Sequence, residues 1–197
     1  MSYMLTQIRR AAHVEVMTSV PARRIFAVMT FALLTAFSAH VAAPLPGTAV
    51  PVSLQTLMVL LSGLLLGPAL GAAAQTAYLM AGAAGLPVFA AGLGVPYLFG
   101  PTGGYLLAFP AAAAVAGAVA AQARGGTGAR VAVLALAGVL ATLAVYAGGT
   151  AQLTLLTGDA AGAVRMGVLP FLIGDLAKLV FAVIVALRIR RRTLALL

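Results

Sequence analysis

An aspartate and a lysine stand three residues apart in an otherwise apolar run, in the stretch G-D-L-A-K-L at residues 174–179. Residues at i and i+3 share one face of a helix, so Asp175 and Lys178 can pair. Charges within a membrane helix are costly and normally face the interior of a bundle, where they pair or bind something. The stretch therefore predicts either a structural ion pair or a binding site for a polar solute. A proton relay would need a second buried carboxylate, which the apolar runs do not offer.

Further polar or conformationally free residues fall beside the ends of apolar runs. Gln55, in P-V-S-L-Q-T, has an amide that donates and accepts, and its alternative role is a hydrogen bond between helices. Tyr97, Thr102 and Tyr105 belong to a long loop and the helix start after it, where tyrosines also form aromatic belts. Gly103, in G-P-T-G-G, lets backbone approach a ligand closely. That loop is not a phosphate-binding P-loop, because it lacks G-K-[ST] and follows no strand.

The composition indicates that these residues belong to an integral membrane protein. Of 197 residues, 63% are hydrophobic and 8% are charged, whereas a soluble domain has roughly 25% charged residues. The formal net charge is +9, but the basic residues flank the apolar runs, as the positive-inside rule expects. They do not form the basic stripe of a nucleic-acid-binding face, so we exclude that class of partner.

Several kinds of chemical site are excluded by residue type. The chain has no cysteine, which excludes disulfides and thiolate metal sites. His13 and His40 lie on either side of the first apolar run without metal-ligand spacing. Asp175 has no histidine or serine partner that would make a catalytic set. We therefore expect neither an enzyme nor a bound metal or cofactor.

The apolar runs and the turn residues between them predict an all-α fold of six membrane helices in one domain. The predicted spans are 25–43, 53–66, 69–85, 104–123, 131–156 and 168–187. Residues 1–21 form a leader outside the membrane fold, residues 22–192 the helical domain, and residues 193–197 a short tail. The first run also resembles a cleavable signal peptide, but it is longer than a usual apolar signal region, and we favour a retained helix.

The arginines predict the orientation of this bundle. Basic clusters precede the first span, join the fourth to the fifth, and follow the sixth, which places the N- and C-termini on the cytoplasmic side of a bacterial inner membrane. The connection at 86–103 then lies outside. It is long, apolar and rich in glycine, and irregular backbone of this kind is expected to pack over the bundle as a lid.

Small residues recur every four positions on the first predicted helix, at Ala32 and Ala36. Such a face lets another helix approach closely. Its ordinary role is packing within the bundle, and its alternative role is docking to another membrane protein.

Four motifs in a fixed order resemble one known family over about residues 25–190. They are P-V-S-L-Q-T at 51–56, G-L-P-V-F-A at 85–90, G-P-T-G-G-Y at 100–105 and G-D-L-A-K at 174–178. Together they resemble BioY, the biotin-binding membrane subunit (S component) of energy-coupling-factor (ECF) transporters.

The resemblance implies an external biotin pocket beneath loops, a transmembrane coupling subunit and two ABC-type ATPases as partners. It also implies that Ala32 and Ala36 dock the coupling subunit. Ser53 departs from the threonine expected there, and the N-terminal leader is unusually long.

Biotin suits the residues chosen above. Its ureido ring has two N–H donors and a carbonyl acceptor, and its tail ends in a carboxylate. Asp175 would accept from the ureido N–H groups with help from Gln55, while Lys178 would meet either the tail carboxylate or the ureido oxygen. Apolar walls and a lid would come from Leu86, Val88, Phe89, Tyr97 and Tyr105.

Three alternatives stay open at this point. The ligand could be another vitamin, although a cation such as thiamine would suit the single lysine poorly. The chain could be a stand-alone secondary carrier without ATPases. It could also be a structural or assembly membrane protein that binds no ligand.

Overall fold

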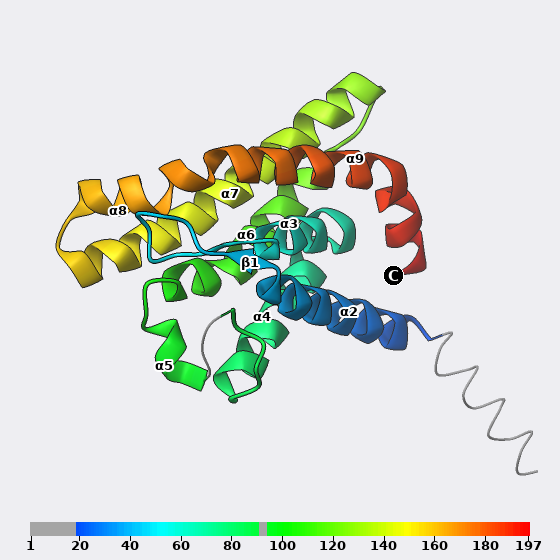
Figure 1. The fold of residues 1–197 in the computed structure, drawn as a ribbon. Helices are drawn as coiled ribbons and strands as arrows, with labels where there is room; N and C mark the ends of the chain where they lie inside the picture. Colours follow the sequence, from blue (N-terminus) through cyan, green and yellow to red (C-terminus); the bar gives the residue numbers. More distant parts are fainter. Residues whose placement is uncertain (1–18, 91–93) are drawn as a thin grey trace, which may run out of the picture.

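The protein is described here by a computed structural model that covers residues 19–90 and 94–197 (Figure 1). Most of the predicted leader at 1–21, and His13 with it, lies outside these residues. The described chain is mostly helical. Its helices and strands are α2 (Val20–His40), β1 (Ala42–Ala43), β2 (Val52–Ser53), α3 (Gln55–Leu66), α4 (Pro68–Ala83), α5 (Gly94–Leu98), α6 (Gly103–Ala120), α7 (Thr127–Thr157), α8 (Ala160–Gly167), the 3-10 turn η1 (Leu169–Phe171) and α9 (Leu172–Leu196).

Each of the predicted spans coincides with a helix, but several boundaries differ. The largest error concerns the last span, because α9 begins at Leu172 and continues to Leu196 instead of covering 168–187. Val168 is not helical, with φ −126° and ψ −58°, and a 3-10 turn containing Pro170 separates it from α9. At the other end, arginines continue the helix because arginine is a good helix former.

The predicted outer connections contain short regular elements. Ala42–Ala43 pairs with Val52–Ser53 as a small antiparallel hairpin, α5 lies within 86–103, and α8 lies within 157–166 apart from its last residue. The expectation of irregular backbone at 86–103 is therefore only partly right.

Within the described residues, four helical stretches are long and apolar enough to cross a membrane: Val20–His40, Gly103–Ala120, Thr127–Thr157 and Ala160–Leu196. The other two predicted spans correspond to α3 and α4, with 12 and 16 residues, fewer than the about 20 of a typical span. Because several helices are long and apolar enough to span a bilayer, the chain is a multi-pass membrane protein.

Helix α3 lies in the middle of the molecule, between α2 and α9 (Figure 1), and almost all of its residues are buried. Its close approach to α6 depends on Gly63, where a Cβ would overlap the carbonyl oxygen of Ala113. The next crossing, of α6 on α7, places Gly104 against the carbonyl of Gly148. Small residues at helix crossings let backbones meet, which is how membrane helices gain packing contacts.

A buried polar cluster joins α2, α3 and α4. The Gln75 side-chain amide donates to Thr35 Oγ1 at 3.2 Å and to Ser62 Oγ at 3.1 Å. All three side chains are fully buried, and buried polar groups need such partners. The cluster fixes how α2 sits against its neighbours and explains why Ala32, on the same helix, packs into the core of its own chain.

Candidate functional site

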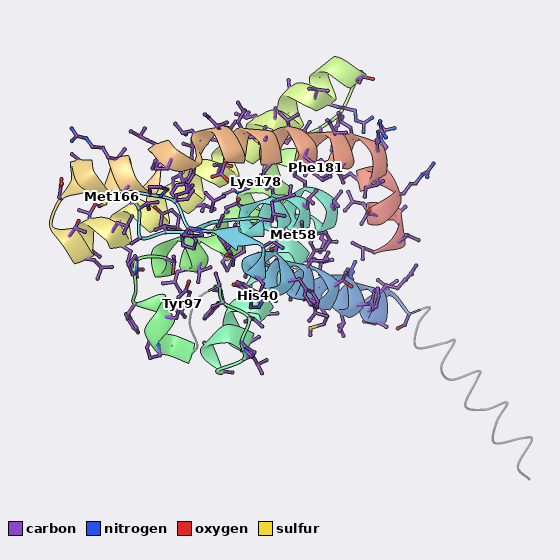
Figure 2. The ribbon with its side chains drawn as sticks, viewed as in Figure 1. His40, Met58, Tyr97, Met166, Lys178 and Phe181 are labelled. Carbon is purple, nitrogen blue, oxygen red and sulfur yellow. The ribbon has the colours of Figure 1, made fainter. Side chains whose placement is uncertain are left out.

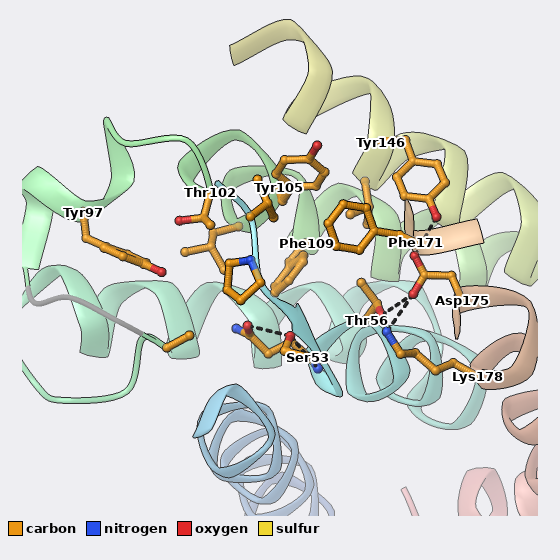
Figure 3. Close-up of a pocket in the computed structure, with 16 residues that line it drawn as sticks. Ser53, Thr56, Tyr97, Thr102, Tyr105, Phe109, Tyr146, Phe171, Asp175 and Lys178 are labelled. Carbon is orange, nitrogen blue, oxygen red and sulfur yellow. Dashed lines mark hydrogen bonds and ion pairs between the residues drawn. The ribbon is translucent and has the colours of Figure 1, made fainter. Parts of the chain in front are cut away.

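A cavity of about 60 Å³ lies among α3, α6, α7 and the start of α9, with Tyr97 of α5 at its rim (Figure 3). Figure 2 shows that Tyr97 and Lys178 come from separate parts of the fold, α5 and α9. The residues lining the cavity are Val50, Pro51, Ser53, Gln55, Thr56, Ala90, Tyr97, Thr102, Tyr105, Leu106, Phe109, Val145, Tyr146, Phe171, Asp175 and Lys178.

Asp175 and Lys178 form the ion pair that their spacing predicts. Lys178 Nζ lies 2.7 Å from Asp175 Oδ1, and the two side chains are only 9% and 8% exposed. Asp175 lies in the first turn of α9, where the positive end of the helix dipole favours a carboxylate. The pair is buried at the wall of the cavity, so its position alone is compatible with a structural role and with ligand contact.

Two residues from other helices form hydrogen bonds with this ion pair. Thr56 Oγ1 accepts from Lys178 Nζ at 3.0 Å and lies 3.1 Å from Asp175 Oδ1, to which it donates. The Tyr146 hydroxyl donates to Asp175 Oδ2 at 2.6 Å. Helices α3, α7 and α9 therefore meet at one carboxylate.

The pair keeps hydrogen-bonding capacity that its protein partners do not use. An ammonium group has three N–H donors, and each carboxylate oxygen can accept about two hydrogen bonds. Lys178 donates to two oxygens, and Asp175 Oδ2 accepts from Tyr146. Within the described residues, one N–H of Lys178 and one lone pair of Oδ2 therefore have no protein partner.

Gln55 is held in one orientation at the start of α3. Ser53 Oγ donates to Gln55 Oε1 at 3.0 Å, and Gln55 Nε2 donates to Tyr78 Oη at 2.7 Å. Ser53, where a threonine was expected, still supplies the hydroxyl that this contact needs. The Tyr78 hydroxyl donates in turn to the carbonyl of Val88 at 3.2 Å, which ties the amide to the predicted lid.

Aromatic rings pack at and behind the cavity wall beside that lid. Phe89 stacks on the lining residue Tyr97 with ring centroids 5.3 Å apart, and it packs edge-to-face with Tyr78 at 5.6 Å. Tyr105 is 8% exposed and its hydroxyl donates to the carbonyl of Gly167 at 2.8 Å. Tyr105 therefore does not lie in an exposed aromatic belt, the alternative considered for it.

The remaining predicted residues lie beside the cavity. Phe89 and Val88 support its rim without being among the lining residues, and Leu86 is 54% exposed. Gly103 packs so closely that a Cβ would overlap the carbonyl oxygen of Leu98. Its missing side chain thus serves close packing of the rim.

Comparison with known proteins decides the family. The sequence model of the BioY family matches residues 10–195 of this chain. The chain belongs to the BioY family.

The curated BioY relatives are named as transporters. A probable biotin transporter BioY of Pyrococcus horikoshii is 35% identical over 173 residues, which cover 87% of this chain and 99% of that protein. The biotin transporter BioY of Thermotoga maritima is 38% identical over 143 residues, covering 72% of this chain and 82% of that protein.

One solved structure shares the fold. It is the S-component for biotin from an ECF-type ABC transporter, with a TM-score of 0.76 and 21% sequence identity, covering 87% of this chain and 92% of that one. The motif order that suggested BioY is therefore confirmed as a family assignment.

The sequence analysis named neither Tyr146 nor Thr56 as a candidate site residue of this BioY-family chain. A signal for Tyr146 was present. It is a tyrosine well inside a long apolar helix, and a buried tyrosine hydroxyl usually has a hydrogen-bond partner. Asp175, as the carboxylate of the last span, was an obvious candidate for that partner.

Proposed function

We propose that this chain binds biotin in the cavity at Asp175 and Lys178 and is the substrate-specific subunit of an ECF-type ABC transporter. The observation that carries the proposal is the buried, self-neutralising pair with one unused donor and one unused acceptor beside apolar walls. A biotin molecule has matching groups, since its ureido N–H groups need acceptors and its oxygens need a donor. The names of the relatives agree with this ligand.

Two binding modes fit the pair. In both, Asp175 Oδ2 accepts from a ureido N–H. Lys178 donates its free N–H either to the tail carboxylate or to the ureido oxygen.

Biotin methyl ester separates the modes, because it lacks the carboxylate charge. If Lys178 meets the carboxylate, the ester binds the native protein more weakly than biotin does, and Lys178→Met removes that difference. If Lys178 meets the ureido oxygen, the difference between the ligands persists in the variant.

The proposed topology has six crossings with both termini in the cytoplasm and the cavity open to the outside. Arginines near the start of α2, between α6 and α7, and near the end of α9 support it. The short helices α3 and α4 would cross inside the bundle, where neighbouring helices shield their ends. Because the chain has no native cysteine, single cysteines at Phe99 and Arg124 can be labelled selectively. The proposal expects an impermeant reagent to reach the first from outside and the second only after lysis.

The proposed partners are a transmembrane coupling subunit and two ABC-type ATPases, since the sequence contains no G-K-[ST] phosphate-binding motif of its own. The coupling subunit would dock on α2 around Ala36, which packs only partly against the core of its own chain. Ala32 is 7% exposed within its own chain, whereas Ala36 is half-buried, so Ala36 would make the larger contribution. A stand-alone carrier would instead take up biotin in cells that lack every coupling subunit, and our proposal expects no uptake there.

The proposed functional unit is the single domain at 22–192, working without a cofactor, with residues 1–21 as a leader that is dispensable for binding. Deletion of residues 1–18 should leave biotin affinity unchanged. N-terminal sequencing of the mature protein should find α2 retained, and a mature chain starting near residue 44 would contradict this.

The direct test is calorimetry of the purified chain in detergent with a panel of biotin, thiamine and riboflavin. We expect biotin to bind at micromolar concentration or tighter and to raise the thermal midpoint, since a ligand of the native state stabilises it. Binding of another vitamin in place of biotin would redirect the assignment. Binding of none would favour a structural or assembly protein.

A further inference from the structure

Gln152 joins the outer part of α7 to the rim of the cavity. Its side-chain amide donates two hydrogen bonds, to the carbonyl oxygen of Leu98 at 3.0 Å and to that of Gly100 at 2.6 Å. These carbonyls are more than fifty residues away along the chain. Leu98 is the last residue of α5, and terminal carbonyls of a helix lack partners within it. Gln152 supplies such a partner from another helix.

The segment that Gln152 holds carries two lining residues of the cavity. Tyr97 directly precedes Leu98, and Thr102 follows Gly100 by two positions, and both line the cavity. Gln152 itself is not among the lining residues. It lies in a groove on the other side of the segment, together with Phe99 and Leu155. Gln152 thus acts on the cavity through residues 97–102, which we call the rim segment.

The rim segment has little local stability of its own. Helix α5 has five residues and none of them is buried, and helices this short are not stable in isolation. Its local backbone bonds are those of tight turns, from Phe99 N to Pro96 O, from Gly100 N to Tyr97 O and from Gly103 N to Gly100 O. Its position therefore depends on contacts with other elements, of which the stack of Tyr97 on Phe89 and the two Gln152 bonds are the most specific.

The neighbouring stretch at residues 86–90, whose Phe89 stacks on Tyr97, is held in a comparable way by different residues. His40 Nε2 donates to the carbonyl of Pro87 at 3.1 Å, and Tyr78 donates to the carbonyl of Val88. Both stretches are thus fastened by side-chain donors from helices. At the rim segment, both side-chain hydrogen bonds come from Gln152, so a single substitution removes them together.

We propose that Gln152 is a positioning residue that holds the rim segment over the cavity and thereby sets the rate at which bound ligand leaves. The proposal rests on the assignment of the cavity as the biotin site. Loss of the two bonds frees Tyr97 and Thr102 to move away from the mouth. The effect falls chiefly on dissociation, because the residues that recognise the ligand, Asp175 and Lys178, keep their own partners.

The test compares Gln152→Leu, which keeps a side chain of comparable bulk but has no N–H donor, with Thr142→Val on the same helix. Among the described residues, the Thr142 side chain bonds only the Gly138 carbonyl of its own helix, so it controls for loss of a hydrogen bond in α7. Dissociation of labelled biotin is followed after addition of excess unlabelled biotin. Two lost hydrogen bonds predict about tenfold faster release by Gln152→Leu, with an association rate within about twofold of native and no change in Thr142→Val.

A second measurement needs no biotin. A spin label on Phe99→Cys is unique, because the chain has no cysteine, and its mobility reports the rim segment. We expect higher mobility when Gln152→Leu is added, and unchanged mobility with Thr142→Val. Gln152→Asn, one methylene shorter, should also raise mobility and serves if Gln152→Leu does not fold.

The outcomes separate this proposal from the one it rests on. Unchanged label mobility in a folded Gln152 variant overturns the positioning role. So does a dissociation rate within twofold of native. Absence of biotin binding by the native chain overturns the biotin assignment instead, and label mobility still tests whether Gln152 holds the rim segment.

Discussion

The hydroxyl of Tyr146 donates a 2.6 Å hydrogen bond to Oδ2 of Asp175, the carboxylate oxygen that Lys178 does not contact. The two oxygens therefore have different tasks. Oδ1 is occupied by Lys178 and Thr56, while Oδ2 is held by Tyr146 and keeps room for one further donor. A carboxylate fixed at both ends presents its free lone pair in one direction, which is the geometry needed to select a ligand N–H.

Tyr146→Phe tests this arrangement. The substitution keeps the ring and removes only the O–H, so Asp175 loses one partner and its fixed orientation. Hydrogen bonds to charged groups contribute about 1.5 kcal/mol or more, and we expect biotin affinity to fall roughly tenfold by calorimetry. Tyr105→Phe is the matched control, because its hydroxyl bonds the Gly167 carbonyl and not the ion pair. An equal loss of affinity in both variants would contradict the specific role of Tyr146.

Removing one member of the ion pair should lower the thermal stability of the protein more than removing both. Asp175→Asn leaves the Lys178 ammonium buried without its counter-charge, and Lys178→Met does the same to Asp175. Each should weaken biotin binding by about 2 kcal/mol or more and lower the thermal midpoint. The double variant should recover thermal stability without recovering affinity. If both single variants fold and bind biotin normally, the pair is only structural.

Gly63→Ala should destabilise the bundle at the crossing of α3 and α6. The added Cβ would overlap the carbonyl oxygen of Ala113 and lie 2.8 Å from the Cβ of Ala116, so the helices must separate. We expect a loss of about 1–3 kcal/mol, as for other overpacked sites, measured as a lower thermal midpoint in detergent. Gly128→Ala is the control, because nothing lies within 4 Å of its Cβ position. That variant should be as stable as native or more so, since alanine favours a helix.

Ala36→Leu should block assembly with the coupling subunit while leaving biotin binding intact. A larger side chain on the small-residue face of α2 prevents close approach of a partner helix, whereas the cavity at Asp175 and Lys178 is lined by other elements. Co-purification with the coupling subunit measures assembly, and calorimetry measures binding. Ala132→Leu, at an exposed position of α7, controls for added bulk. Normal assembly by Ala36→Leu would place the docking surface elsewhere.

Sequence reasoning found those parts of the site that depend on short separations. The pairing of Asp175 with Lys178 follows from helical spacing, and apolar runs bounded by Gly and Pro located each main helix. It did not find that Thr56 and Tyr146 meet the same carboxylate, across separations of 119 and 29 residues. Those contacts depend on which faces of α3, α7 and α9 meet. That choice is decided by packing of small residues such as Gly63, whose partners a single sequence does not name.

The boundary errors have a local origin. The run from Val168 onward is apolar throughout, so hydropathy alone cannot show that Val168 and the turn around Pro170 precede the helix. Likewise, arginines beyond Leu187 end an apolar run without ending a helix. Hydropathy reports where a chain can meet lipid, and helix ends are decided by backbone geometry.

The cancellation of charge between Asp175 and Lys178 also has an electrical consequence. They are the only formally charged residues that line the cavity in the described part of the chain, so a bound carboxylate anion would give the loaded site a net negative charge. Carrying one such charge inward against a potential of 100 mV, negative inside, costs about 2.3 kcal/mol. Membrane voltage would thus oppose uptake of an anionic ligand by this protein. Inward transport of such a ligand would need another source of energy, a requirement that hydrolysis of a nucleotide by partner subunits would meet.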